Sequence, residues 1–259
     1  STWTVFRFLF AKRSMWHVLI GFALGATSMN AIGQFLSAFL VRNFHMGIAA
    51  AGQLLGMIAG AAMASGLLIG GFGVDWAGKR DKRWYVWGPA VGLALAAPLF
   101  LFAFDQSLVA SCVVLLIAAH VCMFVYYAPT LALAQNMVGA NMRASSAFVV
   151  SLVLGLVGIG LGPTIVGVLS DRFAIRAFGR AGFEALCPGG AAPAGSAHVL
   201  ATACSNASAA GIRNALMVMS LLCLWGAFHY ALAGRSLRRD LDTHFRVAAP
   251  VVDLTTPAA

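Results

Sequence analysis

Six apolar segments, separated by polar stretches, account for most of this chain of 259 residues. Their approximate bounds are 14–41, 48–72, 84–104, 108–138, 144–171 and 212–234. A helix needs about 20 apolar residues to cross the hydrocarbon core of a bilayer, and every segment reaches that length. Several segments are longer, which favours tilted or kinked helices. The pattern predicts an all-α membrane protein with six transmembrane helices.

Composition and charge agree with this interpretation. The chain is 61% hydrophobic and 10% charged, whereas a soluble domain carries about 25% charged residues. Its net charge is +9, and Lys and Arg accumulate in the cytoplasmic loops of membrane proteins. With both termini cytoplasmic, twelve of the cations lie inside and five outside. We therefore expect an integral protein of the plasma (bacterial inner) membrane, and no nucleic-acid partner.

The two ends and one long connection complete the predicted organisation. Residues 1–13 are a cytoplasmic lead-in, residues 14–234 the six-helix transmembrane domain, and residues 235–259 a cytoplasmic tail without stable structure. The connection of about 173–211, rich in Gly, Ala, Pro and Ser, is predicted to be a long outer loop. Because the chain begins with Ser1 and not with Met, we expect a fragment or a processed product.

Two of the five cysteines, Cys187 and Cys204, lie in this outer loop. The outer compartment permits oxidation, which favours a disulfide between them over two free thiols. The other three lie in predicted spans, where cysteine serves as a packing residue. No cysteine pair has the spacing to histidines that a metal site requires, so we expect no metal and no cofactor.

Small residues form one stripe along the second span and another along the fifth. They are Gly52, Gly56, Gly60 and Ala64 in the second span, and Ser151, Gly155, Gly158 and Gly162 in the fifth. Such stripes let helix backbones approach closely where no hydrophobic force drives helices together. They serve either packing within this bundle or docking against another domain, and the sequence supports both interpretations equally.

Polar positions recur at helical spacing near the middle of the first and fourth spans. They are Thr27, Asn30, Gln34 and Ser37 in the first span, and His120, Tyr127 and Thr130, with Met123 between them, in the fourth. Polar groups at membrane depth are costly unless they are paired or face a watery cavity. We favour a shared substrate pathway over interhelical hydrogen bonding. His120 alone is better explained as a hydrogen-bonded packing residue than as a proton relay.

None of the eight acidic residues lies in the middle of a span. Carriers coupled to protons or sodium ions usually hold a buried acid for the coupling ion. Either such coupling is absent, or its carboxylate lies in sequence outside this chain.

The strip from Gly71 to Arg83 brings glycines, acids and cations together between the second and third spans. Asp75 ends the second span on the side where the fifth span begins, near Arg143. A carboxylate is favoured near a helix N-terminus by the unpaired N–H groups and the helix dipole. We therefore expect Asp75 to latch the fifth span, with Gly71 and Gly78 allowing a close approach.

The pattern Gly71-x-x-x-Asp75-x-x-Gly78-Lys79-Arg80 resembles the loop motif of the major facilitator superfamily. Trp76 departs from it, because the family usually has Arg or Lys directly after the acid. The resemblance implies a gating motif, whose members would be Gly71, Asp75, Gly78, Lys79, Arg80 and Arg143. The alternative for the cations of this loop is that most of them are only topological anchors.

A second resemblance indicates which part of such a transporter this is. The run from Gly155 to Pro163, followed by Gly167 to Arg172, is similar to the eleventh helix of the family, above all in its spinster-like branch. The resemblance covers about residues 14–234 and implies a C-terminal half, helices seven to twelve. It further implies that the first and fourth spans line the central cavity, and that the second and fifth meet the opposite half.

The resemblance implies a secondary active transporter, or the C-terminal half of one, that moves a small organic or amphipathic solute by alternating access. Its partners would be a small-molecule substrate, the lipid bilayer, and the missing N-terminal six-helix half or a second copy. Two alternatives are an intramembrane serine protease, built on Ser65, Gly66 and His229, and a non-transporting scaffold. Met63 stands where such proteases have Gly, so we expect no enzyme.

Overall fold

The computed structural model describes residue 7, residues 10–179 and residues 181–248, and the regular elements of that part of the chain are helices. Within it, six stretches are long and apolar enough to span a membrane. They are Arg13–Phe44, Ile48–Gly78, Trp84–Phe104, Val109–Asn136, Ala140–Phe178 and His198–Leu241. The predicted all-α membrane protein with six transmembrane helices is confirmed.

Three of the six spans contain interruptions. The first and third spans are the continuous helices α2 (Arg13–Phe44) and α5 (Trp84–Phe104). The second consists of α3 (Ile48–Leu68), the π-helix η1 (Ile69–Gly73) and α4 (Val74–Gly78). The fourth is split into α6 (Val109–Phe124) and α7 (Tyr127–Asn136). The fifth consists of the 3-10 turn η2 (Ala140–Met142), α8 (Arg143–Val153), the π-helix η3 (Leu154–Ile159) and α9 (Gly160–Phe178). The short α10 (Phe183–Leu186) and η4 (Pro188–Gly190) precede the long α11 (His198–Ala248).

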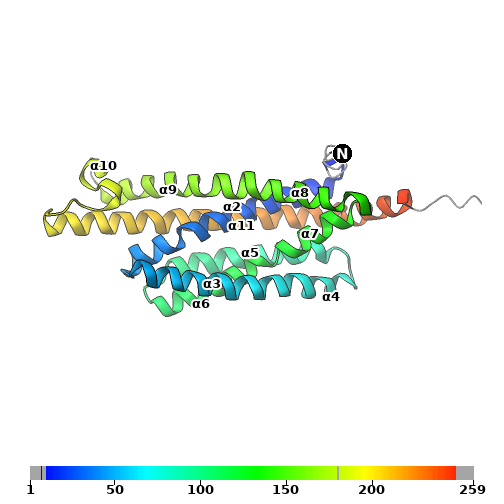
Figure 1. Ribbon diagram of the computed structural model, residues 1–259, viewed down its shortest axis with the longest axis horizontal. Coiled ribbons are helices and arrows are strands. Elements are labelled where there is room, and N and C mark those ends of the chain that lie inside the picture. Colours follow the sequence, from blue (N-terminus) through cyan, green and yellow to red (C-terminus); the bar gives the residue numbers. More distant parts are fainter. Residues whose placement is uncertain (1–6, 8–9, 180, 249–259) are drawn as a thin grey trace, which may run out of the picture.

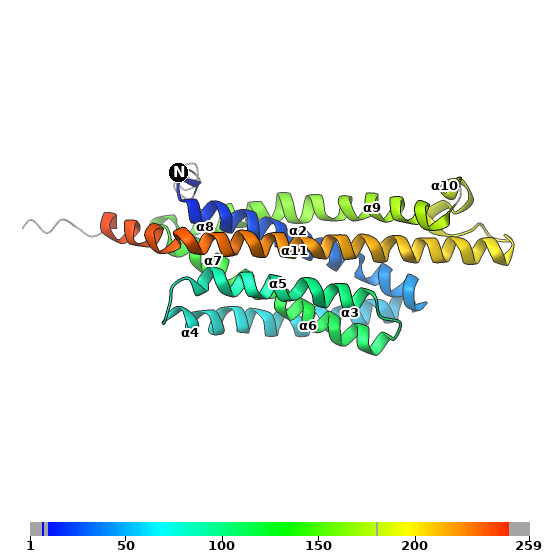
Figure 2. The ribbon, with the colours of Figure 1, turned by 180° about the vertical axis from the view of Figure 1, so that it is seen from behind.

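The long helices run along one axis, and the two ends of the bundle differ (Figures 1 and 2). The start of α2, α4 and the last turns of α11 lie at one end, and α10 lies at the other (Figure 1). We call the first the cationic end, because the connection from α4 to α5 carries Lys79, Arg80, Lys82 and Arg83. We call the second the disulfide end, because Cys187 and Cys204 are bonded there.

The predicted extent of the outer loop, about 173–211, is wrong, because the connection between the two long helices is shorter. α9 continues to Phe178 and α11 begins at His198, not at 212. Low hydropathy predicts a loop here, but a stretch rich in Ala forms a helix readily once one side of it can pack. Cys204 and Ala207 supply that side, because both are buried in a small cluster at the disulfide end.

The prediction that the tail from 235 lacks stable structure is also wrong, because α11 continues to Ala248. Its polar composition only indicates that this part lies beyond the apolar core. Asp240 holds it in place, since its carboxylate accepts hydrogen bonds from the backbone N–H (2.9 Å) and the Oγ (2.7 Å) of Ser14 at the start of α2. The predictions for residues 249–259, and for residues 1–6, 8 and 9 of the lead-in, concern residues outside the described part of the chain.

The fourth span is interrupted between α6 and α7, where Val125 and Tyr126 form a turn. Pro129 follows four residues after Val125 and has no N–H to donate, so the Val125 carbonyl loses its helical hydrogen bond. The long spans of the sequence predict kinks, and this break is one of them.

Glycines of two neighbouring helices pack directly against the backbone around this break. A Cβ atom at Gly70 would lie 2.5 Å from the Val125 oxygen, and one at Gly66 would lie 2.6 Å from the Val121 oxygen. Gly92 of α5 meets a neighbouring carbonyl in the same way, at 2.6 Å. Weak Cα–H···O contacts become possible at such approaches. The second and third spans are therefore held in backbone contact with the fourth.

Replacing Gly70 by Ala should destabilise the protein by about 1–3 kcal/mol, the usual cost of overpacking. The new methyl group would meet a carbonyl oxygen, which cannot move aside as a flexible side chain can. The midpoint of thermal unfolding in detergent should therefore fall. Gly56→Ala is the matched control, since no atom lies within 4 Å of a Cβ there, and Ala is the better helix former. Equal midpoints for the two variants would contradict the backbone contact.

Peptide mapping without reductant should recover a fragment that joins Cys187 to Cys204 from protein matured in an oxidising compartment. Their Cα atoms lie 5.6 Å apart, across a sequence separation of 17 residues. In the chain-entropy model a loop of this size is constrained by roughly 3 kcal/mol. The buried Cys112 is the internal control and should be recovered as a free thiol. Free thiols at both Cys187 and Cys204 would refute the bond.

Candidate functional site

The stripe of small residues on α3 lies open on the surface of the bundle. The apolar window of this span is 22% buried, against 56% for α2. A Cβ atom at Gly52, Gly56 or Gly60 would meet nothing within 4 Å, and Ala64 is exposed. Within the part of the chain that the structure describes, this stripe therefore takes no part in packing among the six helices.

The stripe of the fifth span is divided, and the expectation that its members share one face is wrong. Ser151 and Gly155 are exposed. Gly158 and Gly162 instead pack on α2, where a Cβ at Gly162 would lie 2.7 Å from the Thr27 carbonyl oxygen. The reason is the π-helix η3, which takes more residues per turn than an α-helix and so rotates the later positions around the axis.

The polar stripe of α2 is also divided between interior and surface. Thr27 is 5% exposed, and its hydroxyl donates to a carbonyl of its own helix (2.8 Å) and approaches the Val157 oxygen of η3 (3.3 Å). Asn30 and Ser37 are half-buried, and Gln34 is exposed. Thr27 thus joins the contact between the first and fifth spans, while the other three residues reach the surface.

The polar stripe of the fourth span lies mostly inside the bundle. His120 is 5% exposed and Thr130 is fully buried. The Nδ1 atom of His120 lies 2.8 Å from the Leu116 oxygen, and its ring packs edge-on against Phe100. The Thr130 hydroxyl lies 2.6 Å from the hydroxyl of Tyr230 in α11. These two residues therefore join helices of this bundle to one another.

Tyr127 is half-buried, whereas Met123 is fully buried. His120 and Met123 before the turn and Thr130 after it are all buried, so the turn before α7 does not separate the stripe into two faces. Part of each polar stripe is therefore buried inside the bundle. The members of the predicted pathway that reach the surface are Asn30, Gln34, Ser37 and Tyr127.

The loop motif is organised by contacts within the hairpin from α4 to α5. The Tyr85 hydroxyl donates to Oδ1 of Asp75 (2.9 Å). The same ring covers Gly78, where a Cβ atom would lie 2.8 Å from it. Trp76 is the residue that departs from the family pattern. The Cζ atom of Arg80 lies 4.7 Å from the centroid of its ring, a distance at which a cation is attracted to an aromatic face.

The remaining members of the predicted gating motif are spread around this hairpin. Gly71 has open space around it and Lys79 is exposed. Arg143 begins α8. The hydrogen bond of Asp75 goes to Tyr85 of α5, so its latch on the fifth span stays a prediction.

Sequence reasoning missed the contacts that join α5 to α11 at the cationic end. Asp81 forms a salt bridge with Arg238 (2.7 Å) and accepts the backbone N–H of Arg83 (2.9 Å). The backbone hydrogen bond, and then the Arg238 guanidinium, hold the pKa of Asp81 below its ordinary value. The contacts persist until the pH falls through that lowered pKa. An Asp three residues before a helix is a turn signal in the sequence, but nothing in the sequence points to Arg238.

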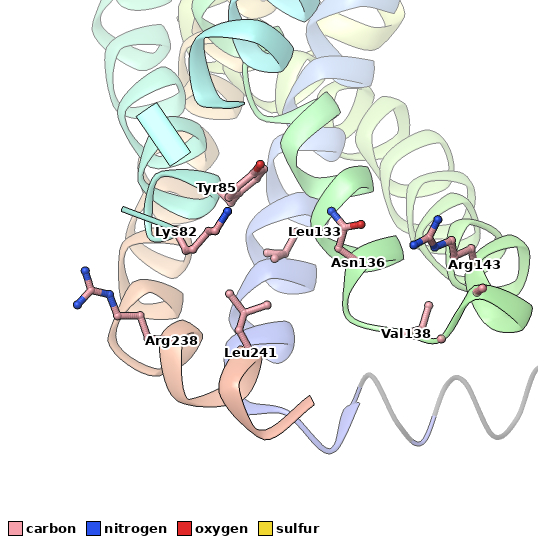
Figure 3. A pocket seen from close by; sticks show the side chains of 10 residues that line it. Lys82, Tyr85, Leu133, Asn136, Val138, Arg143, Arg238 and Leu241 are labelled. Atoms are coloured by element: carbon pink, nitrogen blue, oxygen red, sulfur yellow. The ribbon is translucent and has the colours of Figure 1, made fainter. Parts of the chain in front are cut away.

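A cavity of about 550 Å³ lies at the same end, between α5, α7, α8 and α11. Figure 3 shows Lys82 and Tyr85 on one side of it and Asn136 and Arg143 on the other. Leu133 lies between them (Figure 3). The structure thus brings Arg143 into one cavity with Tyr85, the partner of Asp75.

The candidate parts of a serine protease lie on different helices. Ser65 is exposed on α3, and the neighbouring Gly66 packs against the fourth span. The Nδ1 atom of His229 in α11 lies 3.1 Å from that of His17 in α2. A nucleophile needs its base within hydrogen-bond reach, and the imidazole is instead paired with another histidine.

Comparison with known proteins identifies the fold. A sequence profile of the Major Facilitator Superfamily matches residues 1–163. An MFS-type efflux pump of Mycolicibacterium smegmatis is 30% identical over 177 residues, which are 67% of this chain and 41% of the pump.

Two solved structures of a bacterial homolog of the human lysosomal transporter Spinster, both inward-facing, are similar to this one. The unoccupied form has a TM-score of 0.78 and 26% identity, over 92% of this chain and 51% of the homolog. The occupied form has a TM-score of 0.72 and 24% identity, over 89% of this chain and 50% of the homolog. An identity this low supports a shared fold and nothing more. The chain therefore spans about half the length of these relatives. The superfamily profile covers well over half of the chain, and the likeness to Spinster agrees with the branch that the fifth span resembles. By these observations, the chain belongs to the Major Facilitator Superfamily.

Proposed function

We propose that this chain is one six-helix half of a secondary transporter, which moves a small organic or amphipathic solute by alternating access. The observation that carries the proposal is the open surface of α3. Large apolar side chains such as Met57 (70% exposed) and Phe72 (75% exposed) flank a stripe of small residues there. A helix that faces only lipid gains nothing from such a stripe, whereas a helix that meets another helix needs it.

The partner for this surface is the missing N-terminal half or a second copy of the chain. The second span meets it along its whole stripe. From the fifth span, Ser151 and Gly155 contribute, together with apolar residues such as Leu156 (67% exposed). The resemblance of the fifth span to the eleventh helix of the family supports the assignment as a C-terminal half.

The substrate pathway would lie against α2 and the fourth span. Asn30, Gln34, Ser37 and Tyr127 reach the surface and would contact the solute. His120 and Thr130 would support them from inside the bundle, since both are buried among the helices. None of these side chains carries a fixed charge, which favours a solute recognised through neutral polar and apolar groups.

The cationic end would face the cytoplasm, with both termini on that side, in the plasma membrane. The cations of the α4–α5 connection support this orientation. The gating motif would then lie on the cytoplasmic side, where Asp75 accepts its hydrogen bond from Tyr85.

The chain reconstituted alone should associate through α3. Gly56→Leu should weaken its self-association by blocking the close approach of two backbones. Ala231→Leu is the matched control, because it enlarges a small residue on the exposed face of α11, where large side chains such as Trp225 already face outward. Cross-linking in proteoliposomes measures the effect. A chain that stays monomeric and still carries saturable solute flux would refute the half-transporter proposal.

Asp75→Asn should shift the balance between open and closed states by about 0.3–2 kcal/mol, the range for a charge near a helix end, if the carboxylate latches the fifth span. Tyr85→Phe removes the observed hydrogen bond but keeps the charge, so it separates the two contacts. Distances between spin labels across the cationic end of the complete transporter report the balance, and membrane insertion serves as the control for folding. Unchanged distance distributions in Asp75→Asn would reduce the motif to a topological anchor.

A further inference from the structure

The cavity at the cationic end carries positive charge that the transport proposal does not use. Lys82 precedes α5, Arg143 begins α8, and Arg238 lies near the end of α11. All three side chains line the same space of about 550 Å³. They come from segments that lie far apart in the sequence, so their convergence is a product of the fold.

This charge is only partly neutralised. Arg238 pairs with Asp81, and Asp75 is already bonded to the Tyr85 hydroxyl. Among the side chains that the structure describes, Lys82 and Arg143 form no ion pair. A cavity with two such cations and the exposed amide of Asn136 favours an anion with several acceptor oxygens, above all a phosphate group.

The lining of the cavity also has an apolar part, and Leu133 lies between Lys82 and Asn136 (Figure 3). Leu133 and Val138 are each 3% exposed, and the half-buried Leu241 lies beside them on the lining. A free phosphate ion has no apolar group that could contact these side chains. An apolar floor beside a cationic rim suits an amphipathic ligand, and the volume is in the range of pockets that hold small organic groups.

The cavity also lies at the depth of lipid headgroups. Lys82 precedes the third span by two residues, and Asn136 ends the fourth span. Exposed tryptophans surround this end of the bundle, including Trp16 (49% exposed) and Trp84 (38% exposed). Tryptophan is enriched where membrane and water meet, and basic pockets between helices at this level bind anionic headgroups.

We propose that this cavity binds the phosphate headgroup of an anionic phospholipid from the leaflet at the cationic end. Lys82 binds the phosphate oxygens from one side and Arg143 from the other, and Asn136 donates to them from the side of Arg143. The glycerol and the start of an acyl chain lie along Leu133 and Leu241. The lipid is a bound cofactor of the fold rather than the solute, because the cavity lies between helices of one half, apart from the surface residues of the proposed pathway.

The test measures retention of phosphatidylglycerol by the purified chain in detergent, with native mass spectrometry, against phosphatidylcholine as the zwitterionic reference. Phosphatidylglycerol should be retained preferentially. The double variant Lys82→Gln/Arg143→Gln should lose affinity by about 30-fold, since each cation contributes about 1 kcal/mol at a membrane surface. Arg235→Gln is the matched control, because it removes one exposed charge from α11 outside the cavity. Equal loss in control and double variant, or equal retention of the two lipids, would overturn the proposal.

A second arm distinguishes a lipid from a soluble phosphate compound. Leu241→Asn should weaken retention of phosphatidylglycerol while leaving the charged rim intact. Inorganic phosphate and glycerol phosphate, added at millimolar concentration, should not displace the lipid. Displacement by either, with no effect of Leu241→Asn, would assign the cavity to a soluble phosphate ligand instead. Circular dichroism and gel filtration confirm that each variant is folded, and no arm depends on solute flux.

Discussion

A carbonyl oxygen without its helical hydrogen bond, inside a membrane, is the constraint around which three spans are arranged. Water cannot reach the hydrocarbon core, so backbone polar groups must be satisfied by the protein itself. Pro129 has no N–H to donate to the Val125 carbonyl. Gly70, in the short π-helix η1, lets the second span pack directly against that carbonyl. A glycine is required there because a Cβ atom would collide with the oxygen.

The same approach explains why the second span has two kinds of glycine. At the glycines that face the fourth span, such as Gly66, an added Cβ atom would collide with the backbone of that span. Those of the stripe around Gly56 have open space. One helix therefore uses small residues on one side to cover a break inside this bundle, and on the other side presents a surface that these six helices leave open.

α11 gives the bundle its axis and joins the two ends. It packs against α2, α5 and α9 along most of its length. At the cationic end, Asp240 accepts a hydrogen bond from Ser14 at the start of α2, and Arg238 forms a salt bridge with Asp81, which precedes α5. At the disulfide end, Cys204 bonds to Cys187 beyond α10. These contacts fix the positions of the helices relative to one another along the bundle axis. They therefore also shape the cavity that Lys82 and Arg143 line.

The sequence alone determined the number of spans, their order and the family. Those conclusions rest on hydropathy and on a local motif, which are properties of contiguous residues. It could not determine the extent of α11, because helices continue past the apolar core wherever side chains such as Cys204 and Asp240 find partners. It could not place His120 and Thr130 inside the bundle, because their burial depends on which helices pack against them. Nor could it divide the stripe of Gly155 and Gly158, because the π-helix η3 changes the direction of the residues that follow. Nor could it pair Asp81 with Arg238 or assemble the cationic cavity. Those arrangements depend on which faces of distant helices meet, and only the tertiary structure decides that.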